Sequence, residues 1–516
     1  MHQISPATAI SPRSESYPDD PGGSWLGHPR GVYYLFMAEM WERFSYYGMR
    51  ALLILYLVDH WRYDDSRATT TYGAYTAMAF GASVLGGALA DHVFGLKRSL
   101  LIGGVLILLG HGTLALEDAI GGTGPGVERL FYLALALIIV GTGFFKPAVA
   151  AQVGALYRTG DPRREGGFYL FYCGINVGAA LAPLFCGYLG QRYGWAWGFG
   201  LAAIGMAFGL MVVLSGRKCL PDPLSKPSGT KLNGMTVAVP FAGIAISYCL
   251  LLFPDAVGLV LLLSLATGLA VLGRFMVTEA TADERRRLAA ALTLIIAASC
   301  FWSLFEQAGS SLNLFAARAV DLHAGFLTME SSQTQFFNPA FILLGAPVFA
   351  VLWRWLARRG REPRPPMKFV LGLAQAGAGF GILAIGALLT PLGTKVPLIW
   401  LVTAYLLHTT GELCLSTPGY ATMTRLAPAK VTTLVMGLWL FALSAGNFIG
   451  GKIAGWTASA AGDGSNLAGY ANVFANVALA AAVASLVLLA LVPKLNRMIG
   501  AGIAHATAGA ETPGRS

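Results

Sequence analysis

The sequence predicts an all-α membrane protein with fourteen transmembrane helices in groups of six, two and six. The chain of 516 residues is 55% hydrophobic and only 12% charged, whereas soluble domains carry about 25% charged residues. Its apolar runs reach the length of about 20 residues that a helix needs to cross a bilayer. This composition excludes an ordinary soluble enzyme or binding domain.

The predicted spans fall into three groups along the chain. The first six lie near 31–60, 68–92, 98–117, 129–157, 167–191 and 195–216. Two more lie near 236–253 and 256–278, between a stretch with three prolines and the charged residues 279–287. The last six lie near 288–317, 332–357, 367–390, 397–426, 430–459 and 471–496. We therefore expect a bundle over 30–216, a linker with two extra helices over 217–287, and a second bundle over 288–497.

The two ends of the chain differ from this apolar body. Residues 1–29 are rich in Pro, Ser and Gly and lack the apolar core of a signal peptide. We expect them to be a disordered cytoplasmic segment, and we expect a disordered tail over 498–516.

Lysines and arginines concentrate in every second loop. They are Lys97, Arg98, Arg158, Arg163, Arg164, Arg217, Lys218, Arg285, Arg286, Arg287, Arg358, Arg359, Arg361, Arg364, Arg425 and Lys430. Loops of the other set, including the one expected at Glu117 and Asp118, hold few basic residues. The positive-inside rule places the basic loops and both termini in the cytoplasm. We expect the protein to lie in the cell inner (plasma) membrane. The net charge of +10 then implies no nucleic-acid partner, because these residues form no patch on a soluble domain.

The first predicted span carries a polar face. Its members are spaced i, i+3, i+4, i+7, i+8 and i+11, which puts them on one side of a helix; they are Glu39, Glu42, Arg43, Tyr46, Tyr47 and Arg50. A charge in the middle of a membrane helix costs about 2.5–3.5 kcal/mol on insertion scales. The four charges must therefore face a bundle interior or a water-filled cavity, which indicates a functional polar pathway.

Three further charges lie inside predicted spans: Lys146, Glu306 and Glu412. Together with the first span they make four carboxylates against three cations, so one proton would balance the set. A single buried Glu–Arg pair is often only structural. Seven charges from both halves are harder to explain in this way, since apolar packing usually stabilises as well as buried ion pairs do.

Enzyme and cofactor motifs do not stand out. The six cysteines form no CxxC pair, so neither a zinc site nor a disulfide framework is expected. No HExxH motif, nucleophile elbow or dinucleotide fingerprint is present. We expect no enzyme activity and no cofactor.

The motifs identify a family. The segment Gly87-Ala-Leu-Ala-Asp91-His-Val-Phe-Gly95-Leu-Lys97-Arg98 resembles the loop signature of the major facilitator superfamily. Glu39-x-x-Glu42-Arg43-Phe44-x-Tyr46-Tyr47-Gly48 resembles the helix-one motif of its proton-dependent oligopeptide transporter (POT, or PTR) family, and 168–178 resembles that family's helix-five signature. Further matches are Lys146-Pro147, Trp302 with Glu306-Gln307, Asn338-Pro339, Glu412 with Ser416, and Trp439. The resemblance covers about 30–497 and implies the major facilitator fold, with two extra helices as in bacterial members.

The resemblance also implies roles for individual residues. Arg43 and Lys146 would hold a peptide carboxylate, and Glu412 with Asn176 and Asn338 its amino group. Glu39 and Glu42 would couple protonation to the cations. Arg50 and Glu306 would form a titrating outer gate, and Lys146 with Glu412 would close the cytoplasmic side. Side-chain pockets would be lined by Tyr46, Tyr47, Trp302 and Trp439, with Ser416 beside them.

Two departures from the family pattern remove polar groups. Ala148 stands where the family often has Asn, and Phe80 where a binding-site Tyr is expected. The expected function is proton-coupled import of di- and tripeptides by a monomer in the lipid bilayer, through alternating access. A carrier of nitrate or another small anion, and a peptide sensor that does not transport, remain the alternatives.

Overall fold

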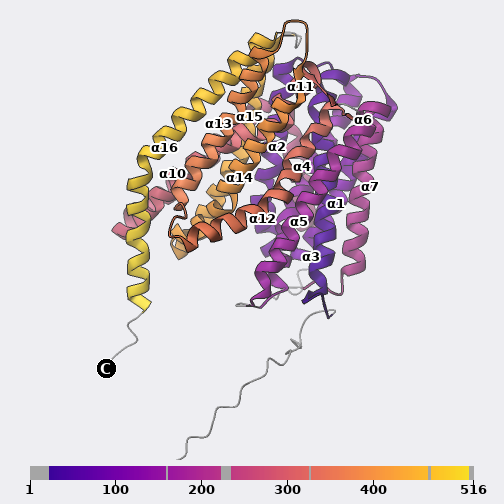
Figure 1. Cartoon of the computed structure of the whole chain (residues 1–516). Helices are drawn as coiled ribbons and strands as arrows, with labels where there is room; N and C mark the ends of the chain where they lie inside the picture. Colours follow the sequence, from indigo (N-terminus) through magenta and orange to yellow (C-terminus); the bar gives the residue numbers. More distant parts are fainter. Residues whose placement is uncertain (1–22, 159–160, 222–233, 325–326, 463–465, 511–516) are drawn as a thin grey trace, which may run out of the picture.

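The computed structural model describes residues 23–158, 161–221, 234–324, 327–462 and 466–510. Helices make up most of this chain (Figure 1). The first bundle contains α1 (Arg30–Leu55), α2 (Asp65–Leu89), α3 (Leu96–Ile120), α4 (Pro125–Ala155), α5 (Arg163–Ala182), α6 (Tyr188–Tyr193) and α7 (Trp195–Gly216). Irregular π-helical segments η1 (Tyr56–His60), η2 (Ala90–Phe94) and η3 (Pro183–Gly187) lengthen α1 and α2 and join α5 to α6.

The remaining helices follow the predicted order. The linker holds α8 (Gly234–Leu252) and α9 (Pro254–Thr278). The second bundle contains α10 (Ala282–Phe305), α11 (Ser311–Ala319), α12 (Phe337–Arg358), α13 (Pro365–Leu389), α14 (Leu398–Leu426), α15 (Thr432–Ala461) and α16 (Leu467–Ala510). Short 3₁₀ segments η4 (Glu306–Gly309), η5 (Ser331–Phe336) and η6 (Ala429–Val431) lie between them.

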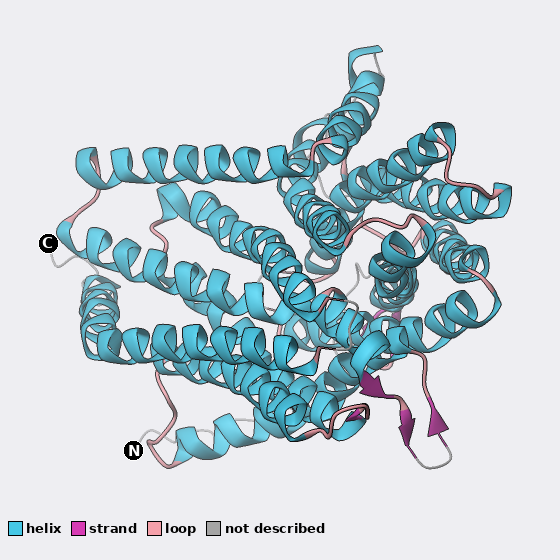
Figure 2. Ribbon diagram, turned by 90° about the horizontal axis from the view of Figure 1, so that it is seen from above, coloured by secondary structure: helices cyan, strands magenta, loops and turns pink. Residues whose placement is uncertain are grey.

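Strands are very short in the described chain. Antiparallel pairs join β1 (Ser24–Trp25) to β2 (His28–Pro29) and β4 (His323–Ala324) to β5 (Leu327–Thr328), and β3 (Val320–Asp321) lies parallel to β6 (Val396–Pro397). Figure 2 shows the helical architecture from above, with these strands as small connections. They tie loops together and contribute no sheet to either bundle.

The described residues form fourteen spans when α5 with α6 and α10 with α11 each count as one, which confirms the predicted all-α fold. In the described residues, eleven spans are long and apolar enough to cross a membrane by composition alone. The helix α1 is not among them, because Glu39, Glu42, Arg43 and Arg50 lie along it. The helix that carries the predicted polar pathway is therefore one of those that composition alone does not identify as a span.

The molecule has two distinct ends (Figure 1). We call the lower end in that view, where α1 begins and α16 ends, the termini end. We call the opposite end, where α6 and α11 lie, the α11 end. The basic loops α2–α3, α4–α5 and α12–α13 lie at the termini end, as their alternation along the sequence predicts.

Each bundle has its own apolar core. Tyr56, Phe131 and Phe199 are buried in the first, and Phe315 and Phe474 in the second. The bundles meet where α2 crosses α15 through glycines. A Cβ atom added to Gly73 would lie 3.0 Å from the Cα of Gly451. Small residues allow such close backbone approach between membrane helices.

The extra helices bridge the two bundles. Gly243 of α8 faces Val140 of α4, and Gly258 of α9 faces Phe448 of α15. Ion pairs tie α9 to the second bundle near both of its ends, at 2.6 Å between Lys452 and Asp255 and 3.0 Å between Lys430 and Glu279.

Several predicted boundaries need correction. Residues 24–29 form a β-hairpin where disorder was expected, supported by an edge-to-face contact of Trp25 with Tyr33. The helix α10 begins at Ala282 and not near 288, because Thr281 and Glu284 form a capping box that starts it within the charged stretch. The helix α16 continues to Ala510, past the predicted end at 497, through an alanine-rich sequence that favours helix. Residues 1–22 and 511–516 lie outside the described residues.

Candidate functional site

The first part of the site is a charge cluster along α1. Arg43 Nε lies 2.8 Å from Glu39 Oε1 and 2.8 Å from Glu42 Oε2. The three side chains are at most 5% exposed. Glu39 lies one turn before Arg43 on the same face, so the helix itself brings this pair together. The predicted clustering of these residues is therefore present within one helix.

Lys146 of α4 extends this cluster from a second helix. Its Nζ lies over the Phe80 ring at 3.9 Å from the centroid, and 4.9 Å from the centroid of Tyr46. This buried Nζ has no hydrogen-bond partner within the described chain. A cation over an aromatic face is stabilised by the ring quadrupole. The aromatic ring of Phe80, the residue that departs from the family pattern, thus contacts the cation directly.

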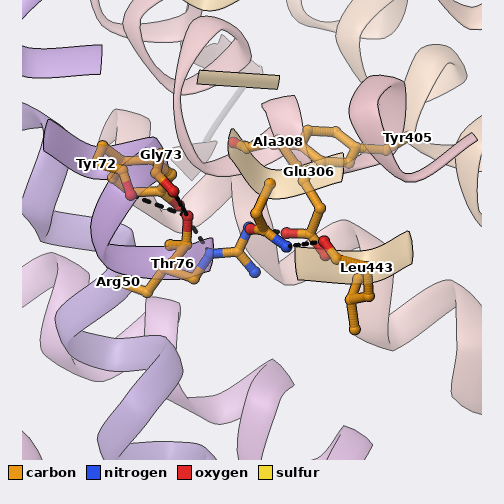
Figure 3. A network of polar contacts seen from close by, with 9 residues as sticks. Arg50, Tyr72, Gly73, Thr76, Glu306, Ala308, Tyr405 and Leu443 are labelled. Atoms are coloured by element: carbon orange, nitrogen blue, oxygen red, sulfur yellow. Dashed lines mark hydrogen bonds and ion pairs between the residues drawn. The ribbon is translucent and has the colours of Figure 1, made fainter. Parts of the chain in front are cut away.

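The second part of the site joins the two bundles. Arg50 of α1 donates from Nη2 to Glu306 Oε2 at 2.5 Å and from Nε to Tyr72 Oη at 2.7 Å. Figure 3 shows the guanidinium between Tyr72 of α2 and Glu306 of the second bundle. Both partners of the ion pair are buried, with 7% and 6% of their side chains exposed.

Glu306 lies where a membrane helix breaks. The sequence predicted one continuous span near 288–317, but α10 ends at Phe305 and the 3₁₀ segment η4 precedes α11. A Cβ atom at Gly309 would collide with Tyr72 Oη. The break and its glycine therefore allow the second bundle to approach Arg50 closely.

Further polar contacts join the bundles at the same end. Arg318 donates two hydrogen bonds to Asp65, of 2.6 Å and 2.7 Å. Asn313 donates to the carbonyl of Ala51 at 2.8 Å, and Ser332 Oγ donates to Gln191 Oε1. The α11 end is thus closed by several independent contacts.

The third part of the site is Glu412, in the middle of α14. Asn338 of α12 donates to Thr409 Oγ1 at 3.0 Å and to Glu412 Oε2 at 3.4 Å. The predicted neighbours Asn338 and Glu412 are thus brought together. Lys146 and Glu412, the predicted pair at the termini end, make no ion pair in the described structure. The structure is therefore closed at the α11 end, with this second pair apart.

The other predicted residues are distributed around these groups. Tyr46 is fully buried in the first bundle, and Tyr47 lies under Arg50 at 5.7 Å. Asn176 is buried and donates to its own helix, to the carbonyl of Tyr172. Trp302 is half-buried beside Phe301 and Phe305, and Ser416 lies one turn after Glu412. Trp439 is buried against Phe369 in the core of the second bundle.

Sequence reasoning missed some residues of the site. Tyr72 holds Arg50, Thr409 shares Asn338 with Glu412, and Asp65 with Arg318 forms a second ion pair between bundles. The signal for Tyr72 was weak, because a tyrosine in an apolar span is usually a core residue. Asp65 and Arg318 lie at helix ends, where charges are common and indicate nothing specific.

The arrangement suits a zwitterion. Arg43 and Lys146 present positive charge from the first bundle, and Glu412 presents a carboxylate from the second. Charge-assisted hydrogen bonds of this kind are about twice as strong as neutral ones. Within the described residues, no set of three or more His, Cys, Asp or Glu side chains is placed to hold a metal ion.

Comparisons with known proteins agree on one family. The sequence profile described as "PTR2: POT family" matches residues 97–470. The uncharacterized transporter YclF of Bacillus subtilis is 39% identical over 84% of this chain and 89% of its own. The peptide transporter YePEPT of Yersinia enterocolitica is 35% identical over 93% of this chain and 97% of its own.

Solved structures show the same similarity. A crystal structure of a peptide transporter POT in complex with sulfate matches with a TM-score of 0.81 and 35% identity, over 93% of this chain and 97% of that one. The structural similarity thus covers nearly the whole chain. The chain belongs to the POT family.

Proposed function

We propose that this protein is a proton-coupled symporter that imports di- and tripeptides through alternating access of its two bundles. The observation that carries the proposal is the placement of opposite charges on opposite bundles. Arg43 and Lys146 would receive the peptide carboxylate, and Glu412, supported by Asn338 and Asn176, the amino group. The name of the Yersinia relative, a peptide transporter, supports the same substrate class.

Substrate length follows from this geometry. An extended peptide advances about 3.3–3.6 Å per residue, so charges fixed on two bundles select peptides by length. The aromatic residues Tyr46, Tyr47, Trp302 and Trp439, with Ser416, would meet the side chains, and apolar walls discriminate among side chains only weakly. We expect broad tolerance of sequence with a strict preference for short peptides. Because one chain supplies every proposed contact, a monomer would suffice as the working unit.

Proton coupling would use both charge clusters. Glu306 and Arg50 tie the bundles at the α11 end, and a proton on Glu306 removes the charge that holds them. Glu39 and Glu42 share one cation, Arg43, so protonation there changes the charge offered to a peptide carboxylate. Lys146 and Glu412 would meet when the termini end closes.

The orientation follows from the basic loops. They lie at the termini end, which the positive-inside rule assigns to the cytoplasm. In this proposal the protein lies in the cell inner membrane. The α11 end then faces outward. The structure, closed at the α11 end, corresponds to an inward-facing state in this proposal.

Uptake of dialanine into proteoliposomes tests the function. With an acidic exterior and an inside-negative potential, we expect accumulation above the external concentration, and a protonophore should abolish it. Excess unlabelled dipeptide should compete, whereas nitrate should not. Competition by nitrate alone would favour the anion carrier. Binding of dialanine without uptake or counterflow would favour the sensor.

A further inference from the structure

A buried carboxylate at the α11 end takes no part in the proposed transport cycle. Glu117 was expected in a loop, but it lies in the last turns of α3 with 0% of its side chain exposed. Tyr56 donates to its Oε2 at 2.7 Å. Its Oε1 has no hydrogen-bond partner within the described residues. A carboxylate oxygen that is buried without a donor is expensive and points to a missing ligand.

His60 faces this oxygen. Its Nε2 lies 4.0 Å from Glu117 Oε1 and also lacks a hydrogen-bond partner in the described chain. Its Nδ1 lies 3.3 Å from Asp118 Oδ1, and its ring stacks on Tyr56 with centroids 4.5 Å apart. Tyr56 and His60 are the first and last residues of the π-helical segment η1. Such segments occur often at functional sites, because they redirect side chains out of the regular helical pattern.

The number of available protons shows what this site lacks. A neutral imidazole carries one N–H, so only one of its nitrogens can donate. If Nδ1 donates to Asp118, the lone pair of Nε2 faces the oxygen of Glu117. If Nε2 carries the proton, the lone pair of Nδ1 faces Asp118 instead. With one additional proton, each of the two facing pairs, Nδ1 with Asp118 and Nε2 with Glu117, contains one donor and one acceptor.

We infer that Glu117 and His60 together bind one additional proton, carried on Oε1 or on the facing Nε2, at a site separate from Glu39, Glu42 and Glu306. The surrounding groups supply no other donor to Oε1. From the α1 side they are Tyr56, Arg62 and Trp61, whose indole N–H has no hydrogen-bond partner in the described residues, and from α3 Asp118. The neighbouring α4 and α7 present the uncharged rings of Phe131 and Trp195 to Tyr56.

The bound proton connects three helices. It joins η1, at the end of α1, to α3. Asp118 continues the connection, because its Oδ2 accepts a hydrogen bond of 2.7 Å from the N–H of Ala196, at the start of α7. In the proposed orientation this end faces the acidic exterior. The bound proton would then stabilise the first bundle most when the exterior is acidic, which is the condition that drives import.

Proton release gives the most direct test. In an unfolded chain Glu titrates near pH 4.3 and His near pH 6.5, so a proton that the pair keeps above about pH 6.5 would be bound only in the folded state. Glu117→Gln places an amide N–H where the proton was. Titration of the purified protein from pH 6 to 9 should release about one proton fewer from this variant than from the wild type. Equal proton release would overturn the inference.

Stability gives a second readout. Since the folded state alone holds the proton above about pH 6.5, stability should fall as the pH rises, by up to tenfold in the folding equilibrium per pH unit. We expect the thermal unfolding midpoint to fall between pH 6 and 8 in the wild type and much less in Glu117→Gln. His323→Gln removes an exposed histidine at the same end and should behave as the wild type does. Equal pH dependence in Glu117→Gln and the wild type would contradict the inference.

Transport distinguishes this site from the coupling site. Glu117→Gln should still accumulate dialanine against a gradient, because the transport cycle does not use Glu117. If the variant exchanged dipeptide but failed to accumulate it, Glu117 would belong to the coupling machinery, and the inference of a separate site would be wrong.

Discussion

The two arginines of α1 differ in where their partners come from. Arg43 takes its carboxylates from its own helix, and the cation beside it, Lys146, belongs to the same bundle. Arg50, seven residues or about 10 Å further along the helix, takes its carboxylate from the opposite bundle. Charges within one rigid bundle can remain paired while the bundles move, but a pair between bundles must break. We infer that the Arg43 cluster stays paired while the bundles move and that the Arg50–Glu306 pair acts as a gate.

The largest expected effect comes from the Arg43 cluster. Lys146→Ala removes one of its two cations, so the buried carboxylates lose compensation and should remain protonated. We expect proton-driven dipeptide uptake to be abolished. Lys430→Ala is a control, because it removes a lysine whose ion pair is largely exposed. Normal gradient-driven accumulation by Lys146→Ala would refute the role of the cluster.

Breaking the pair between bundles should separate exchange from coupling. Glu306→Gln imitates the protonated gate, so we expect counterflow of dipeptide to continue while accumulation against a gradient is lost. Parallel counterflow and proton-driven uptake measurements test this, with Glu279→Gln as the control at an exposed pair. If Glu306→Gln retained both activities, Glu306 would not be the coupling site.

Glu412 of the second bundle should matter for substrates that have a free amino terminus. Glu412→Gln removes the charge proposed to contact a free amino terminus. Losing this charge-assisted contact should cost about 1.5–3 kcal/mol of binding free energy. Affinity for dialanine should fall about tenfold to a hundredfold, and much less for its N-acetylated form. Inhibition constants for the two ligands measure the difference. Equal losses would contradict the assignment of the amino group to Glu412.

The ring under Lys146 should also affect substrate binding. Phe80→Leu keeps an apolar side chain but removes a cation–π contact, which contributes about 2 kcal/mol at a desolvated site. We expect the KM for dialanine to rise about tenfold or more, and Phe80→Tyr, which keeps the ring, to change it less. An unaltered KM in Phe80→Leu would show that the ring does not position Lys146.

The second ion pair between bundles should have a smaller effect. Asp65 and Arg318 are about one-fifth exposed, so solvent weakens their pair, which we expect to contribute about 1 kcal/mol. Asp65→Asn should favour opening of the α11 end by about fivefold. Hydrogen–deuterium exchange over 311–319 should rise accordingly, but not in Asp255→Asn, whose pair is more exposed. Unchanged exchange in Asp65→Asn would show that this contact does not hold the end closed.

The sequence by itself determined the spans, their alternation and the polar face of α1. These features are local, because hydropathy over about 20 residues decides membrane insertion and helical spacing decides which side chains share a face. The contact of Glu39 with Arg43 was predictable for the same reason, since both lie on one helix one turn apart. The spacing of Asn338 and Glu412 gave no such local signal, and only the family motif suggested that they meet.

Apart from the Arg50–Glu306 pair, which the family motif suggested, only the tertiary structure decided which charges meet across the bundles, and it alone showed that Glu117 is buried. Tyr72 beside Arg50, the break of the helix at Glu306 and the pairing of Asp65 with Arg318 depend on how helices far apart in sequence pack. Glu117 has the sequence signature of a loop end, and its burial against Tyr56 and His60 follows from the π-helical turn of η1. Burial and pairing are properties of three-dimensional packing, which no local pattern of residues contains.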